Sequence, residues 1–324
     1  MLIMSDIELK KYLSIYKDLC YSHLRKTLDV NNIELCKYQL ELLDNDLDCI
    51  NDFNKCVNFC KENNIDSISY ISDILSDYFS RNLDFINIIK NHIDNLNLQK
   101  LDEPIPYNMK FVNLDSNKVY LSLDLKHAYS QYIDHLNILP DSFNNLFTNT
   151  LPYEYLKENK KIRLFTYNQF LNYIHEDKVL YSILEVLKCD HPLINKINEF
   201  NLKPVSYNVD ELVFDITNCV EEFKPFVGHN YNIIDYEFKV DIFIHHTVKY
   251  LDPDFDNKEH NVNIRYLFST QKHYFSHRYC KYICQIYKAF HKLPLCEYDL
   301  YVPTKDDPNI FYKMSEPIKI TSIE

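Results

Sequence analysis

The chain has 324 residues and a net charge of −12 at pH 7, with 46% hydrophobic and 25% charged residues. These fractions are those of a folded globular protein, and we expect no membrane span because no run of about 18 apolar residues occurs. Its single glycine, Gly228, excludes the glycine-rich phosphate-binding loops of the Rossmann and P-loop types. The negative charge disfavours nucleic-acid binding over the whole surface but is compatible with a local basic channel.

The cysteine count and the amino-acid composition suggest the cellular compartment of the protein and the kind of genome that encodes it. Ten cysteines, together with an amino terminus that does not resemble a secretory signal, predict reduced thiols in the cytoplasm. Heavy use of Asn, Ile, Lys, Asp and Tyr is typical of an AT-rich genome, as in some viruses, phages and parasites. For a viral protein the predicted compartment is the host-cell cytoplasm.

Residues 1–102 are predicted to form a helical region. Apolar residues recur at three- and four-residue spacing from residue 6 to about residue 100. Ser5 or Asp6 is suited to cap the first helix, with Glu8 in its first turn. The first prolines of the chain occur in the stretch LDEPIP and mark a boundary near residue 102.

Residues 103–324 are predicted to form an α+β domain, an antiparallel sheet with helices packed on one side. Alternating β-rich runs and helical spacing place its elements in the following order: a hairpin at 110–125, a helix at 126–136, helices within 153–200, a hairpin at 203–217, one or two strands within 231–251, a helix at 273–292 and a strand at 298–303.

Acidic residues occur at corresponding places in the two predicted hairpins. Asp124 ends the apolar run YLSLDL, and Asp210 and Glu211 lie at the turn of VSYNVDELVFDI. Phosphoryl transfer to a nucleic-acid 3′ end uses two divalent cations about 3.5–4 Å apart, and hard cations bind carboxylate oxygens. Adjacent strands would hold such carboxylates more rigidly than loops.

Both acidic stretches resemble motifs of template-directed polymerases. DLKHAYSQYIDHL, starting at Asp124, resembles motif A of family A DNA polymerases and the Asp-Leu-Lys-x-Ala-Tyr start of reverse transcriptases. VSYNVDELVFDI resembles motif C of family A, with Val209 in place of the motif's histidine. The resemblance covers roughly residues 115–245 and implies a divergent polymerase palm, with nucleic acid and nucleoside triphosphates as partners.

The resemblance implies roles for individual residues. Asp124 and Asp210 would bind Mg²⁺, with Glu211 as a third catalytic carboxylate. The stretch KKIRLFTYNQF stands where motif B is expected and lacks that motif's glycines. By the same resemblance, the substrate-binding residues would be Lys161, Arg163 and Tyr129.

A second interpretation needs no catalysis. Asp124 would then be a helix cap, Asp210 and Glu211 a solvated turn, and Tyr129 a packing residue. The chain would be a viral-type structural or replication accessory protein that binds protein partners through its helical region. The acidic net charge and the absent glycines favour this alternative.

Histidine and cysteine recur in the predicted tail helix. His273, His277, Cys280 and Cys284 would lie on one face, where four ligands cannot surround a zinc ion tetrahedrally without help from His291 or Cys296. We therefore do not expect structural zinc in this helix, and the thiols are better explained as buried packing residues.

Overall fold

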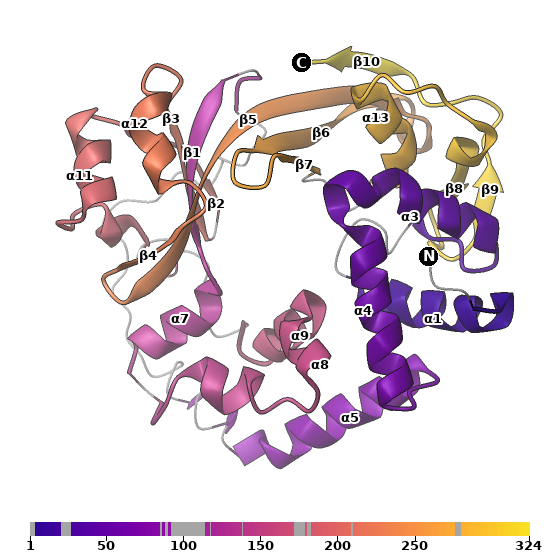
Figure 1. The fold of residues 1–324 in the computed structure, drawn as a ribbon, viewed down its shortest axis with the longest axis horizontal. Coiled ribbons are helices and arrows are strands. Elements are labelled where there is room, and N and C mark those ends of the chain that lie inside the picture. Colours follow the sequence, from indigo (N-terminus) through magenta and orange to yellow (C-terminus); the bar gives the residue numbers. More distant parts are fainter. Residues whose placement is uncertain are drawn as a thin grey trace.

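The computed structural model describes residues 4–20, 27–84, 86–87, 90–91, 114–116, 118–137, 139–171, 179, 183–208, 210–275 and 280–324. Amino-terminal helices are followed by an eight-stranded antiparallel sheet that carries further helices (Figure 1). The α+β class predicted from the sequence is confirmed. No described helix is long and apolar enough to cross a membrane.

Four helices form the described part of the amino-terminal region: α1 (Asp6–Leu19), α3 (Ile33–Leu47), α4 (Cys49–Glu62) and α5 (Ile68–Arg81). α1 begins as its sequence predicts. The Ser5 side chain accepts a hydrogen bond from the Glu8 backbone N–H, and the Glu8 carboxylate accepts one from the Ser5 backbone N–H at 3.1 Å. The boundary predicted near residue 102 lies outside the described residues.

The large sheet has the strand order β2-β3-β1-β5-β6-β7, with β4 and β10 paired to the two ends of β5. Its strands are β1 (Val119–Leu125), β2 (Pro204–Asn208), β3 (Glu211–Asp215), β4 (Asn230–Ile233), β5 (Tyr236–Asp252), β6 (Lys258–Leu267), β7 (Lys272–Phe275) and β10 (Ile320–Ile323). A separate two-stranded sheet joins β8 (Tyr301–Pro303) to β9 (Phe311–Lys313). The β2-β3-β1-β5 portion has the order of a split β-α-β unit.

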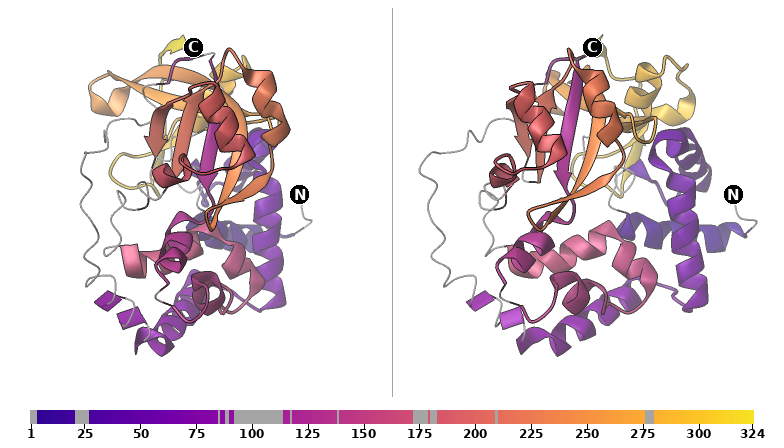
Figure 2. Two further views of the ribbon diagram at one scale, coloured as in Figure 1. Left: turned by 90° about the vertical axis from the view of Figure 1, so that its left-hand side faces the viewer. Right: turned by 60° about the vertical axis from the view of Figure 1, so that its left-hand side comes forward.

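The remaining helices connect these strands: α7 (Ala128–His135), the π-helical turn η2 (Asn144–Thr148), α8 (Glu154–Glu158), α9 (Lys160–Leu171), α11 (Pro192–Glu199), α12 (Val220–Phe223) and α13 (Ile283–Phe290). Three 3₁₀ turns complete the described elements: η3 (Lys224–Phe226), η4 (Pro253–Phe255) and η5 (Glu297–Leu300). Helices α5, α7 and α9 gather beyond the end of β1, as the views of Figures 1 and 2 agree.

The two faces of the central strand β1 differ, because successive side chains of a strand point to opposite sides. Leu121, Leu123 and Leu125 join an apolar cluster that also takes in residues of α7, α11 and α12. Tyr120, Ser122 and Asp124 point to the other face, where Tyr120 packs in a small apolar cluster with Val213 and Phe243. The predicted packing of helices on one side of the sheet is confirmed here.

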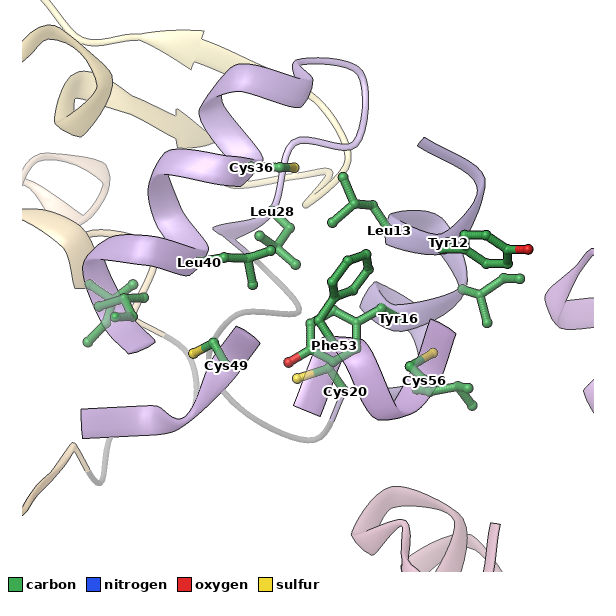
Figure 3. Packing of buried hydrophobic residues seen from close by; sticks show 14 of the residues in the cluster. Tyr12, Leu13, Tyr16, Cys20, Leu28, Cys36, Leu40, Cys49, Phe53 and Cys56 are labelled. Atoms are coloured by element: carbon green, nitrogen blue, oxygen red, sulfur yellow. The ribbon is translucent and has the colours of Figure 1, made fainter. Parts of the chain in front are cut away.

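A second apolar cluster joins segments that are far apart in the sequence. It combines α1, α3 and α4 with the second half of β5, with β6 and with residues as late as Ile318. Figure 3 shows its amino-terminal part, where Leu13, Tyr16 and Phe53 pack beside cysteine side chains. The cysteines of α4 are buried, as expected for the inner stripe of a helix.

The structure corrects the predicted tail helix. Lys272–Phe275 form strand β7 instead, and α13 begins only at Ile283. The turn before β7 places Gln271 at a positive φ of 55°, so the chain reverses and pairs with β6 in the register Ile264↔Phe275. This tertiary pairing overrides the helical spacing of the segment.

Two other predicted elements differ in extent. β1 pairs with β3 and β5, and the first run of the predicted 110–125 hairpin, residues 110–113, lies outside the described residues. The predicted strand at 298–303 begins as the 3₁₀ turn η5, so only Tyr301–Pro303 are extended.

Truncation of Leu123, at the middle of β1, would measure how much the first apolar cluster contributes to stability. Leu123 is fully buried, so Leu123→Ala should lower the free energy of unfolding by about 2–5 kcal/mol, measured by urea denaturation. Leu293→Ala is the matched control, because Leu293 is 44% exposed and its truncation should cost less than about 0.5 kcal/mol. Similar losses in both variants would contradict this assignment of the core.

Candidate functional site

The sheet brings the three acidic residues of the two motifs to the same end of neighbouring strands. β1 and β3 pair antiparallel with Asp124 directly opposite Glu211. Asp210 occupies the β2–β3 turn, and its backbone carbonyl accepts a hydrogen bond from the Leu125 N–H at 2.6 Å. Directly opposed residues of an antiparallel pair share a face, so the Asp124 and Glu211 side chains are neighbours.

The environment of Asp124 makes its negative charge costly. Burial raises the pKa of this carboxyl to about 8, with further upward contributions from the charges of Glu211 and Asp210. Lys160 and Arg265 act in the opposite direction but do not offset the burial. A divalent cation beside Asp124 would favour the ionised form, so the site has the electrostatic character of a cation site.

Glu211 is fixed by a buried ion pair. Arg265, on β6, holds it with two hydrogen bonds, Nη1–Oε1 of 2.6 Å and Nη2–Oε2 of 3.0 Å. The Ser122 hydroxyl donates a further hydrogen bond to Oε1. The guanidinium carbon of Arg265 also lies 4.2 Å from the centre of the Phe243 ring. Both carboxylate oxygens of Glu211 are therefore already hydrogen-bonded to Arg265. Glu211 influences Asp124 through its negative charge and by helping to hold β3 in place.

The residues that hold Glu211 are distant from it in the sequence and were not among the predicted site residues. Ser122 precedes Asp124 by two positions and so shares its face of β1, which is a signal that the sequence contains. Arg265 is a lone charge in the strand stretch NVNIRYL, but nothing in the sequence pairs it with a turn residue 54 positions earlier. Lys239 was also missed: it stands opposite Asp124 on β5, with its Nζ 3.9 Å from Asp241.

The basic residues predicted to bind substrate have different surroundings. The Lys161 ammonium donates a hydrogen bond to the backbone carbonyl of Asp18, near the end of α1, and so joins α9 to the helical region. The positive charge of Arg163 is one cause of the lowered pKa of His127, which places α9 beside the junction of β1 and α7. Among the lysines of this stretch, Lys160 is the one whose charge lowers the pKa of Asp124.

Tyr129, the third predicted substrate-binding residue, is in α7. Its side chain packs against the apolar cluster that covers the other face of the sheet. This is the packing position that the non-catalytic interpretation assigns to it. The structure therefore brings Asp124, Asp210 and Glu211 together and leaves Tyr129 among apolar neighbours.

The polar residues that follow Asp124 join α7 to β5. Lys126 forms an ion pair with Glu237 at 3.0 Å. Gln131 accepts a hydrogen bond from the Glu237 backbone N–H at 2.6 Å and donates one to the Glu237 carbonyl at 3.1 Å. His127 adopts a left-handed conformation with φ of 54°, which turns the chain from strand to helix. These contacts fix the direction in which β1 ends.

Searches against protein-family models, curated proteins and solved structures found no match to this chain. The function is therefore argued from the geometry of the site.

The raised pKa of Asp124 predicts how stability depends on pH. The unfolded chain releases this proton near pH 3.8 and the folded chain near pH 8, so between these values the folded state binds more protons and the free energy of unfolding falls as pH rises. Asp124→Asn should remove this decline. As pH rises from 4 to 9, its free energy of unfolding, measured by urea denaturation, should increase relative to that of the wild type by on the order of a few kcal/mol. Asp66 is exposed, so the free energy of unfolding of Asp66→Asn should depend on pH in the same way as that of the wild type. Parallel curves for Asp124→Asn would refute the buried-carboxyl assignment.

The Glu211–Arg265 pair predicts strong energetic coupling. Arg265→Met leaves a buried carboxylate without its partner and should cost about 3–5 kcal/mol in the free energy of unfolding. Glu211→Gln combined with Arg265→Met should cost clearly less than the two single losses added together. A double-mutant cycle by urea denaturation measures the difference, and additive losses would show that the pair is not a coupled unit.

Proposed function

We propose that the chain is a divergent palm-type nucleotidyltransferase that extends a nucleic-acid 3′ end with divalent cations. The observation that carries this proposal is the register of β1 and β3, which sets Asp124 opposite Glu211 and beside the Asp210 turn. The helices on the opposite side of the sheet support it, because they leave the acidic face free of the apolar cluster. The proposal rests on geometry and on motif resemblance.

In the proposed mechanism Asp124 and Asp210 are the ligands of Mg²⁺, because Arg265 already engages both oxygens of Glu211. Carboxylate oxygens are the donors that Mg²⁺ prefers. When bound, paired cations would polarise the phosphate and stabilise the attacking and leaving oxygens. Asp124 would give up its proton as the cation binds, since its pKa is about 8 in the cation-free protein. Lys160, whose charge reaches Asp124, is placed to attract triphosphate.

The partners of this activity would be a nucleic acid and nucleoside triphosphates. The net charge of −12 disfavours nucleic-acid contact over the whole surface, so contact would be local, for example near Lys160 and Lys239. An AT-rich viral or phage genome and a cytoplasmic location are part of the same proposal.

A second candidate is a replication accessory protein that keeps the palm-like sheet without catalysis. Two observations favour it: Arg265 neutralises Glu211, and Lys161 is bonded to α1 rather than left for a substrate. In this alternative the amino-terminal helices would bind a protein partner.

Incorporation of labelled nucleotides into primed DNA and RNA templates, with Mg²⁺ or Mn²⁺, separates the two candidates. Asp124→Asn and Asp210→Asn should each lower incorporation by more than about a hundredfold, because each removes a carboxylate that would hold the catalytic Mg²⁺. Asp235→Asn is the matched control. Asp235 lies in a turn with a φ of 63°, a backbone conformation that asparagine also adopts, so this variant should retain activity.

Full incorporation by either site variant would refute the assignment of the carboxylates. A wild-type chain that is inactive on every template, while folded and able to bind a protein partner, would instead support the accessory role.

A further inference from the structure

A group of three metal-ligand side chains lies away from the acidic site. Asp46 is near the end of α3, His273 is in β7 and His291 directly follows α13. One potential ligand atom from each lies within 4.8 Å of the other two. Asp46 Oδ2 is 3.0 Å from His291 Nε2, and Asp46 Oδ1 is 3.5 Å from His273 Nδ1. Three segments that are distant in sequence thus converge on one buried carboxylate.

The three ligand atoms are close enough to one another to share a single metal ion. Zinc bonds of about 2.0–2.2 Å in a tetrahedron place neighbouring ligand atoms about 3.3–3.5 Å apart. The two separations of 3.0 and 3.5 Å involve different oxygens of the carboxylate, and one ligand atom from each residue lies within 4.8 Å of the others. The side chains would have to move inward to bring one oxygen and both nitrogens to the tetrahedral spacing. The two imidazole rings are steeply inclined, with an interplanar angle of 80°, and approach the carboxylate from different directions.

We propose that Asp46, His273 and His291 bind a divalent transition-metal ion of the zinc type. Two imidazole nitrogens and one carboxylate oxygen suit Zn²⁺, Co²⁺ or Ni²⁺, whereas Mg²⁺ and Ca²⁺ prefer oxygen ligands alone. Three protein ligands leave a fourth position for water. The site is therefore chemically distinct from the carboxylate site at Asp124, and the proposal does not depend on nucleotidyltransferase activity.

The partial exposure of the two histidines would let an ion enter the site from solution. The Asp46 side chain is 1% exposed, whereas those of His273 and His291 are 25% and 23% exposed. The carboxylate thus lies at the bottom of the site and the histidines at its entrance.

Neighbouring groups hold the ligands in place, as the outer contacts of metal sites do. The His273 backbone N–H donates a hydrogen bond to the Asp46 carboxylate at 2.9 Å, and the Tyr287 side chain is hydrogen-bonded to the same carboxylate. The Phe290 ring lies 5.1 Å from the His273 ring, and the Tyr287 ring lies 4.4 Å from the His291 ring. The ligand positions are thus set by packing in all three elements.

A bound ion would join the amino-terminal helices to the far end of the sheet. α3 already contacts β7 and α13, so the metal would strengthen an existing junction rather than create one. Without metal the same three residues form a hydrogen-bonded His–Asp–His cluster. The experiment therefore has to distinguish a metal site from hydrogen bonding alone.

The test is titration of the full-length chain, stripped of metal with a chelator, with Zn²⁺ by calorimetry and with Co²⁺ by visible absorption. We expect one ion per chain with a Kd in the micromolar range or tighter, Co²⁺ absorption bands typical of four-coordination, and a higher melting temperature with Zn²⁺ than without. Excess Mg²⁺ should not displace the ion.

His291→Gln and His273→Gln should each weaken Zn²⁺ binding by at least tenfold, and Asp46→Asn should do the same. His260→Gln is the matched control: that histidine lies on β6 against Tyr250 and Phe255 and should leave binding unchanged. Circular dichroism without metal confirms that each variant folds. No binding by the wild type, or equal binding by wild type, His291→Gln and His273→Gln, would overturn the proposal and leave a hydrogen-bonded cluster.

Discussion

Both large apolar clusters are built on β5, a strand of 17 residues that has to remain extended along its whole length. Its first half pairs with β1 and β4 and contributes Phe238, Val240 and Ile242 to the cluster beneath the acidic site. Its second half pairs with β6 and β10 and contributes Val248 and Tyr250 to the cluster shared with the amino-terminal helices. A break in β5 would disturb both clusters, so the positions of the acidic site and of the helical region depend on one continuous strand.

The acidic site shows how a fold accommodates charges that repel each other. Three carboxyl groups close together in a partly buried place raise one another's proton affinity unless cations compensate them. Arg265 compensates Glu211 through a two-fold hydrogen bond, and its guanidinium packs on Phe243. Among the described residues no arginine is hydrogen-bonded to Asp124 in this way, and burial raises its pKa to about 8. The two carboxyl groups thus differ: Glu211 joins strands β3 and β6 through Arg265, whereas the charge of Asp124 is not compensated in this way.

Local sequence signals were sufficient where the relevant partners are close in the chain. The capping box at Ser5, the hairpin around Asp210 and the helix after Asp124 follow from neighbouring residues, and each occurs in the structure. Long-range pairing could not be predicted in the same way. The Glu211–Arg265 pair requires knowing that β6 lies two strands from β1. The Asp46–His273 contact was hidden because helical spacing assigned His273 to a helix, whereas pairing with β6 makes it part of a strand.

The cluster shared by α1, α3 and α4 with the carboxyl-terminal elements has a consequence for folding during synthesis. Residues such as Leu13 and Phe53 are synthesised well before their partners Val248, Tyr282 and Ile318. The helices can form locally, but their apolar stripes stay exposed until the later strands arrive, and closing such long loops slows folding. Until those later strands are made, the exposed apolar stripes of these helices favour aggregation or chaperone binding.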